Sequence, residues 1–245
     1  IISCHDKTGV VEFAQLLREF GVEIISTAGT LQVLQDAGIE AVSMGDYTGV
    51  AEMMDGRVKS LHAKIHAGLL GIRTSKLHAE QLKASDYEWI DLCAVNLHPV
   101  QEIIQRTGVT TEEVLDQIDI GGMAMLRSAA KNFRYVTCVV NPDRYATIMH
   151  ELRAHDGEVT FKTRFRLAQE AFASTAQYDQ VIAGYLKRIE PEKYRKVLVI
   201  GGGRARTCPR VEDCAKPARH RTLLRARQPR YRPTCGMHRY SSHRP

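Results

Sequence analysis

The fold is decided by the opening of the chain, which reads Ile1-Ile2-Ser3-Cys4-His5-Asp6-Lys7-Thr8-Gly9 and runs into an apolar helical pattern. The first four residues read as the end of a short apolar strand, and the next five as a polar turn. A helix is predicted next, because apolar residues recur at helical spacing on one face: Val10, Phe13, Ala14, Leu17 and Phe20. Gly21 is predicted to end this helix. A strand, a short turn and an amphipathic helix are the unit from which α/β sheets are built.

The same unit recurs directly downstream. Residues 22–26 read as a second strand, residues 31–37 as a short helix and residues 40–44 as a third strand. This alternation predicts an α/β fold with a parallel sheet. Ligands bind such sheets at the carboxyl ends of the strands, where Lys7 follows the first strand and Thr27-Ala28-Gly29-Thr30 follows the second. Backbone N–H groups at that helix start, beside two threonine hydroxyls, would form a phosphate cradle.

A basic stretch between residues 55 and 71 is the next candidate binding element. Arg57 and Lys59 are two residues apart, so their side chains point the same way in an extended segment. A guanidinium and an ammonium that converge suit a phosphate, although a solvated basic turn is the alternative interpretation. His62 and His66 have metal-ligand spacing on a helix, but no Glu or Cys completes a zincin-like motif, so we expect no metal there.

The rest of the chain predicts more elements of the same kind. Residues 45–75 are loop-rich, residues 91–97 read as a buried strand, and residues 135–140 as the last clear strand. Helices are predicted at residues 76–83, 123–132 and 163–186. Two more are predicted to begin at the capping box that starts with Thr110 and at Asn141-Pro142. The apolar side chains predicted to bury one side of the last helix are Phe165, Ala168, Phe172, Val181, Ile182 and Tyr185.

The net charge of +6 is unevenly distributed. Residues 197–245 contain eleven Arg and one Lys against two acidic residues, a net charge of +10, which leaves −4 on residues 1–196. This profile favours a small anionic substrate over nucleic acid as the partner. No apolar run approaches the roughly 20 residues of a membrane-spanning helix. Cys4, Cys93 and Cys138 lie in apolar runs and read as reduced core residues, so we expect a reducing compartment, the cytosol.

The last fifth of the chain differs in kind. Residues 197–200 read as a strand, and the remainder is rich in Arg, Pro, Cys and His with almost no periodic apolar pattern. We expect this tail to be disordered, because it buries too little apolar surface to offset its ordering entropy. Its abrupt change of composition resembles an out-of-frame translation. Zinc binding by the tail is disfavoured, because the gap between Cys208 and Cys214 is wider than usual for zinc ligands. Nucleic-acid binding by the tail is supported only by its positive charge.

Seven motifs follow one another in the order of a known family. They read Asp6-Lys7-Thr8-Gly9; Ser26-Thr27-Ala28-Gly29-Thr30; Glu52-Met53-Met54-Asp55-Gly56-Arg57-Val58-Lys59-Ser60-Leu61-His62; His66-Ala67-Gly68-Leu69-Leu70; Ile118-Asp119-Ile120-Gly121-Gly122; Ser128-Ala129-Ala130-Lys131-Asn132; and Thr163-Arg164-Phe165-Arg166-Leu167-Ala168 with Thr175-Ala176-Gln177-Tyr178-Asp179. From residue 1 to about residue 190, the chain resembles the amino-terminal part of the bifunctional purine biosynthesis proteins, which join IMP cyclohydrolase to AICAR transformylase.

The resemblance implies a methylglyoxal-synthase-like (Rossmann-like) fold, in which a parallel sheet has helices on both faces. It divides the chain into a cyclohydrolase domain at 1–155, a helical extension at 156–196 and the tail at 197–245. The implied reaction closes 5-formamido-imidazole-4-carboxamide ribotide to IMP with loss of water, without metal or organic cofactor. The motif that opens the family's transformylase domain is absent from the tail, so we expect no transformylase activity from this chain. Homodimer formation is left open.

The family's functional residues map onto this sequence through the motifs. The resemblance implies that Lys59, Asp119 and Lys131 carry the chemistry, and that Asn96 and Ile120 contact the base. His98 stands where the family has an active-site tyrosine, and His5 where it has a phosphate-side serine. His98 keeps a hydrogen-bond donor but titrates near neutral pH. The nucleotide and its phosphate would be held by Lys7, Thr27, Gly29, Thr30, Arg57, Lys59 and Ser60.

Physical arguments give these residues roles. A cation near the formyl oxygen would stabilise negative charge as the carboxamide nitrogen attacks, while Asp119 and Lys131 would move protons. Because the reaction is intramolecular, holding both reacting groups in one conformer contributes strongly. Two other functions suit the fold: a catalytically impaired nucleotide-binding module, which would bind IMP without turnover, and a methylglyoxal-synthase-type lyase, against which the ordered motifs argue.

Overall fold

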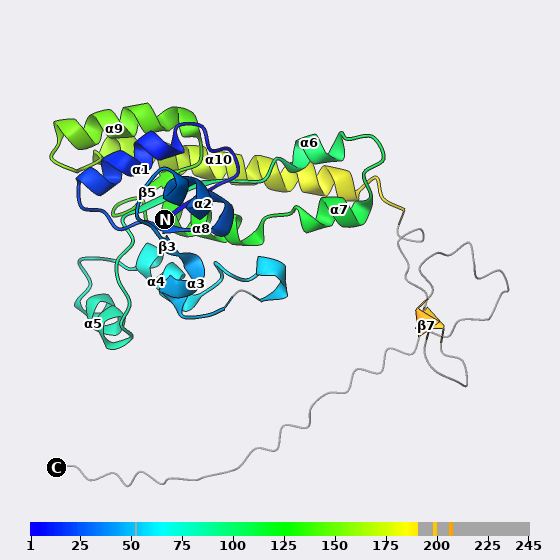
Figure 1. The fold of residues 1–245 in the computed structure, drawn as a ribbon, viewed down its shortest axis with the longest axis horizontal. Coiled ribbons are helices and arrows are strands. Elements are labelled where there is room, and N and C mark those ends of the chain that lie inside the picture. Colours follow the sequence, from blue (N-terminus) through cyan, green and yellow to red (C-terminus); the bar gives the residue numbers. More distant parts are fainter. Residues whose placement is uncertain (52, 191–197, 200–205, 208–245) are drawn as a thin grey trace, which may run out of the picture. The chain divides into compact units, whose positions relative to one another are not determined.

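In the computed structural model, five parallel strands form one sheet in the order β3-β2-β1-β4-β5. This confirms the predicted parallel sheet and the position of every predicted strand within it, although each strand is shorter than its apolar run. Figure 1 shows the labelled strands β3 and β5 enclosed by helices. Strand order reverses between β1 and β4, so the topological switch point lies at the carboxyl ends of these two neighbours. The strands are β1 (Ile2–Cys4), β2 (Ile25–Ser26), β3 (Val42–Ser43), β4 (Leu92–Asn96) and β5 (Thr137–Val139).

The structure describes residues 1–51, 53–190, 198–199 and 206–207. They fall into two units, Ile1–Ile189 and Glu190–Pro245. In the second unit, β6 (Leu198–Val199) pairs with β7 (Arg206–Thr207) in antiparallel fashion, which confirms the short strand predicted at 197–200. The disorder expected for the rest of the tail, and its cysteines, lie outside the described residues.

Helices cover both faces of the sheet, as the resemblance implies. One face carries α1 (Val10–Glu19), α2 (Ala28–Asp36) and α9 (Tyr145–Ala154), whose apolar side chains share a core with the strands. The other face carries α4 (Ala63–Leu70) and α8 (Ile120–Lys131), again over a continuous buried core. The three cysteines predicted to be reduced core residues are buried and free: Cys4, Cys93 and Cys138.

Helix starts differ from the prediction at two places that matter for the site. Both α2 and α8 begin three residues earlier than expected, because Thr27 and Asp119 occupy their N-cap positions and the glycines lie in the first turn. Helices α5 (Lys76–Ala84) and α7 (Thr111–Asp116) confirm the prediction, and α7 carries the predicted capping box. The short helix α6 (Val100–Ile104) follows Pro99, which lies after β4. The short helix η2 (Pro142–Arg144) begins with its proline and is capped by Asn141.

The region predicted to be loop-rich contains α3 (Met44–Thr48), η1 (Met54–Gly56) and α4. Helix α4 was missed because its cap is unusual: the Nδ1 atom of His62 accepts a hydrogen bond from the backbone N–H of Lys64 at 3.1 Å. Histidine is not among the preferred N-cap residues. The two histidines considered for metal binding therefore belong to the start and body of one short helix.

Helix α10 (Phe161–Leu186) runs along the sheet face over β5 and α8. Its predicted stripe is partly wrong, because Phe165 and Phe172 are 44% and 40% exposed. The buried face consists of Leu167, Ala168, Ala171 and Thr175, whose mostly small side chains allow close packing. Further along, Tyr178 and Ile182 pack against α6 and α7. Among the described residues, neither α10 nor any other helix is long and apolar enough to cross a membrane.

Candidate active site at the switch point

The turn after β1 is shaped by a side chain from β4. The Oδ1 atom of Asn96 accepts hydrogen bonds from the backbone N–H groups of His5 at 2.6 Å and Asp6 at 2.8 Å, and its Nδ2 donates to the Asp6 carbonyl at 2.8 Å. Asn96 was predicted to contact the base through its side chain. In this structure its polar atoms hold the β1–α1 turn, and the contact with the base stays a prediction.

Lys7 lies on the same turn. Its Nζ donates to the carbonyl oxygens of Cys4 at 3.3 Å and His5 at 3.2 Å, which holds the ammonium over the carboxyl end of β1. The predicted binding lysine is therefore anchored at the switch point, where an anionic ligand would meet it.

The threonine-rich turn after β2 divides into inward and outward residues. Thr30 is buried, and its hydroxyl accepts from the N–H of Cys4 at 2.9 Å and donates to the Cys4 carbonyl at 3.1 Å, so it fixes β1 rather than facing a ligand. Thr27 is the N-cap of α2, with its hydroxyl 2.7 Å from that of Ser3. Gly29 is exposed with open space around its Cα, so the first N–H groups of α2 are accessible to an anion.

The basic stretch passes through strained backbone before it reaches the site. Met54, Asp55 and Gly56 have positive φ angles of 52°, 53° and 79°, in the left-handed region that costs free energy for non-glycine residues. Arg57, which follows them, pairs through Nη2 with Oδ1 of Asp116 on α7 at 2.5 Å, and both side chains are more than half exposed. Residues 57–60 form a turn, so the extended backbone that would align the side chains of Arg57 and Lys59 is not present there.

Ser60 and the start of α8 fit closely together. Ser60 is buried, and a Cβ atom at Gly121 would lie 1.9 Å from its Oγ. A Cβ at Gly122 would lie 2.3 Å from Oδ2 of Asp119. Both glycines are thus required by packing within the site. The two glycines therefore allow the close approach of the protein's own side chains, Ser60 and Asp119.

Asp119 is held from two sides. Its Oδ1 accepts from the N–H of Gly122 at 2.7 Å, as an N-cap, and its own N–H donates to the hydroxyl of Tyr178 on α10 at 2.8 Å. Ile120, next in sequence, is 58% exposed at the first turn of α8, where backbone N–H groups lack helical partners. Sequence reasoning missed the contribution of Tyr178, although its motif was noted.

The pKa of His98 is influenced by four neighbouring side chains from separate segments of the chain. Partial burial lowers the pKa of His98 most, and the neighbouring His5, Lys59 and Lys7 lower it further, while the carboxylate of Asp119 raises it. The rings of His5 and His98 face each other at 4.7 Å between centroids, tilted by 53°. The structure therefore brings together three predicted residues from separate motifs and adds His5 to them.

Lys131 is not brought to this cluster within one chain. Asp119 caps the start of α8 and Lys131 is its last residue, so a rise of 1.5 Å per residue separates them by about 18 Å. Its side chain is exposed. Motif reading placed both residues in one site, whereas within one chain they lie at opposite ends of α8.

The two histidines of α4 have structural partners. His66 Nδ1 lies 3.0 Å from the hydroxyl of Ser128 on α8, and burial lowers the pKa of His66. Within the described part of the chain, no three or more His, Cys, Asp or Glu side chains gather in a way that could hold a metal ion.

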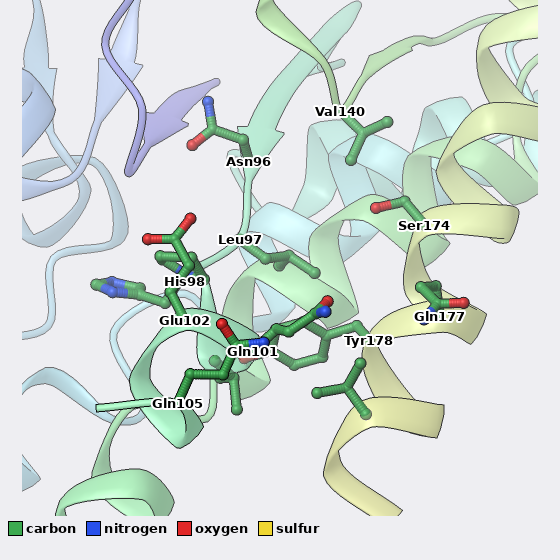
Figure 2. A pocket seen from close by; sticks show the side chains of 13 residues that line it. Asn96, Leu97, His98, Gln101, Glu102, Gln105, Val140, Ser174, Gln177 and Tyr178 are labelled. Atoms are coloured by element: carbon green, nitrogen blue, oxygen red, sulfur yellow. The ribbon is translucent and has the colours of Figure 1, made fainter. Parts of the chain in front are cut away.

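A pocket of about 540 Å³ adjoins the cluster on its other side. Figure 2 shows it between the end of β4, α6 and α10, with Gln101 and Tyr178 directed toward its centre. It shares Asn96 and His98 with the predicted site, and its remaining lining is apolar or uncharged apart from Glu102. The charged residues around His98 and this mostly uncharged pocket thus share His98.

Comparisons with known proteins agree with this architecture. Residues 9–124 match the family model of the MGS-like domain, and residues 129–208 match that of the AICARFT/IMPCHase bienzyme. The second match continues past residue 197, where the composition changes. Together the two matches cover most of the larger unit.

Similar proteins carry one description. Bifunctional purine biosynthesis protein PurH of Listeria welshimeri is 53% identical over 194 residues, and that of Caldicellulosiruptor bescii 46% over 193, each covering 79% of this chain. The chain spans 38% and 37% of the length of these two relatives. The crystal structure of ForH matches with a TM-score of 0.67 and 30% identity, over 76% of this chain and 96% of that one. The chain belongs to the family of AICARFT/IMPCHase bienzymes, with an MGS-like domain as its amino-terminal part.

Proposed function

We propose that this chain is an IMP cyclohydrolase, which closes 5-formamido-imidazole-4-carboxamide ribotide to IMP with loss of water. The observation that supports the proposal is that His98, which follows β4 at the switch point, lies within electrostatic reach of Lys7, Lys59 and Asp119, with Lys7 anchored at the end of β1 and Asp119 at the start of α8. These residues come from four separate segments, and family membership supports the same reaction. The proposed enzyme needs no cofactor and works in the cytosol on a small-molecule ribotide.

Binding divides between two ends of the ligand. The phosphate lies at the first turn of α2, near Gly29 and Thr27, where helix N–H groups and the helix dipole favour a dianion. Lys7 contributes its ammonium from the neighbouring turn. The exposed Arg57 exchanges Asp116 for the ligand, because an exposed ion pair holds its partners weakly. Ile120 offers its backbone N–H to the base.

The reaction takes place at the other end of the ligand, where the carboxamide and formamido groups lie. The carboxamide nitrogen attacks the formyl carbon, forming the new C–N bond while the carbonyl oxygen gains negative charge, which Lys59 stabilises. Asp119 accepts the proton that the nitrogen loses. The oxygen takes up one proton to become the carbinol. A second proton delivered to the carbinol oxygen lets water leave, while the former formamide nitrogen loses its proton and the ring C=N bond forms. His98 lies beside Asp119 and Lys59 and suits this proton delivery.

Lys131 enters this scheme from a second copy of the chain. Within one chain it lies about 18 Å from Asp119, so a role at the reacting centre needs a homodimer in which α8 of the partner approaches the site. A homodimer of this kind would reconcile the catalytic role that the motif implies for Lys131 with its distance from Asp119 in one chain.

The decisive experiment measures IMP formation from the formylated ribotide. Lys59→Ala and Asp119→Asn are expected to abolish turnover, whereas Lys162→Ala, an exposed lysine on α10, serves as the matched control. Calorimetry with IMP runs in parallel. Binding without turnover by well-folded protein would favour the impaired nucleotide-binding module, and turnover of dihydroxyacetone phosphate would favour the lyase.

A further inference from the structure

His5 and His98 form an imidazole pair at the mouth of the site. Their ring centroids are 4.7 Å apart, and each ring is carried at the carboxyl end of a switch-point strand, His5 after β1 and His98 after β4. The pair is preorganised, because Asn96 from β4 holds the backbone N–H of His5 at 2.6 Å. The backbone that carries the His5 ring is thus held by a residue of β4, the strand that the His98 ring follows.

The surroundings of the pair are mostly cationic. Lys7 approaches from the β1–α1 turn and Lys59 from the segment after η1, and both disfavour a charged His98. Asp119 from the start of α8 favours it, and Glu102 on α6 lines the adjoining pocket. Two imidazolium rings at this separation repel each other, so the doubly charged pair is disfavoured without a counterion.

An anionic ligand reverses this balance. A phosphate dianion placed near Lys7 and the start of α2 adds negative charge beside the pair, and a nearby opposite charge favours the protonated form of an imidazole. Resting on the proposed function, we infer that His5 is a ligand-binding residue and that the His5–His98 pair takes up a proton when the nucleotide binds. Neither ring would do so alone to the same extent, because the pair offers two sites for one proton near the phosphate.

The sign of the pH dependence follows. The pKa of His98 in the free protein is lowered, so the ring is mostly neutral at and above neutral pH. Binding an anion raises that pKa, so proton uptake occurs between the free and the bound values. The association constant for IMP should therefore fall as pH rises through this window, by up to about tenfold per pH unit for one linked proton.

The test is calorimetric titration of IMP in buffers of different ionisation enthalpy, between about pH 6 and pH 8, with EDTA present to exclude a bound metal. IMP carries its own titrating phosphate, so the measured quantity is the difference in proton uptake between wild type and variant. His5→Ser should reduce the extra uptake and His98→Tyr should reduce it further, and both should flatten the pH dependence. His150→Ser, an exposed histidine on α9, should retain both.

A second measurement needs no ligand. Histidine resonances followed by NMR should show the pKa of His98 rising when His5 is replaced by Ser, because one source of repulsion is removed. Proton uptake in His5→Ser equal to that of wild type would overturn the inference while leaving the cyclohydrolase proposal in place. Failure of folded wild-type protein both to bind IMP and to form it would overturn both proposals, whereas IMP formation without linked proton uptake would overturn only this inference.

Discussion

The hydroxyl of Tyr178 accepts a hydrogen bond from the backbone N–H of Asp119 at 2.8 Å, across 59 residues of sequence. This contact ties the long helix α10 to the start of α8. Because the Asp119 carboxylate is also held by the N–H of Gly122, the residue proposed to accept the substrate proton is oriented from both sides. A helix outside the sheet-building units thereby takes part in shaping the site.

Replacing Tyr178 with Phe removes this acceptor and leaves the Asp119 N–H without its partner. An unsatisfied polar group costs about 1–3 kcal/mol, and the half-buried position points to about 1 kcal/mol in the free energy of unfolding. We expect kcat to fall about tenfold with little change in KM, as for loss of a positioning contact. Tyr185→Phe, on the same helix, is the control. An unchanged kcat in Tyr178→Phe would show that Asp119 needs no support from α10.

Gly29→Ala separates stability from binding. The position is exposed in the first turn of α2, with nothing within 4 Å of an added Cβ, so alanine should raise stability by about 0.5–1 kcal/mol through helix propensity. The same methyl group would obstruct a phosphate at the helix N–H groups, so IMP affinity should fall at least about tenfold. Denaturation and calorimetry measure the two effects. Unaltered affinity would place the phosphate elsewhere.

Gly121→Ala should destabilise the protein by about 1–3 kcal/mol, because the new Cβ would meet the Ser60 hydroxyl oxygen. Ser60→Ala in the same chain removes that oxygen and should restore most of the lost stability. The double-mutant cycle isolates the pair. Independent, additive losses would contradict the close fit between the basic stretch and α8. If Ser60 also holds the nucleotide, the rescued protein should remain weak in IMP binding.

The Arg57–Asp116 pair should matter more to binding than to folding. Both side chains are more than half exposed, so breaking the pair costs at most about 1 kcal/mol of stability. Arg57→Gln should weaken IMP binding and reduce its salt dependence, because a cation is lost. Asp116→Asn keeps the arginine and releases it, so affinity should be equal or higher. Weaker binding in Asp116→Asn would mean that the ion pair, and not the freed arginine, is what the ligand needs.

Lys131 offers a test of assembly. If the site takes this lysine from a partner copy, Lys59→Ala and Lys131→Ala are each inactive alone but complement each other when mixed. Random reassembly of a symmetric dimer would restore about a quarter of wild-type turnover, since half the dimers are mixed and each holds one complete site. Mixing should be done under conditions that let subunits exchange. Absence of recovery, with mixed dimers demonstrated, would confine the site to one chain.

Most of the sheet could be read from the chain, because strand and helix periods are local properties. The alternation from Ile1 to Met44 placed three strands and two helices, and the apolar runs at 91–97 and 135–140 placed the other two strands of that sheet. Shorter elements in the region 45–75 escaped, since a helix of one or two turns with a histidine cap has almost no periodic signal.

The fold class, the family motifs and the polar residues at the ends of the strands can all be read from the amino-acid sequence. The contacts that each of these side chains makes depend on the tertiary structure. Thr30 and Asn96 form hydrogen bonds with the end of β1 and the turn after it. The hydroxyl of Tyr178 on α10 accepts a hydrogen bond from Asp119, and the ring of His5 lies next to that of His98. The reason is physical: backbone periodicity depends on neighbours in the chain, whereas the partner of a hydroxyl, amide or imidazole depends on which distant segments the packed core brings within hydrogen-bond reach.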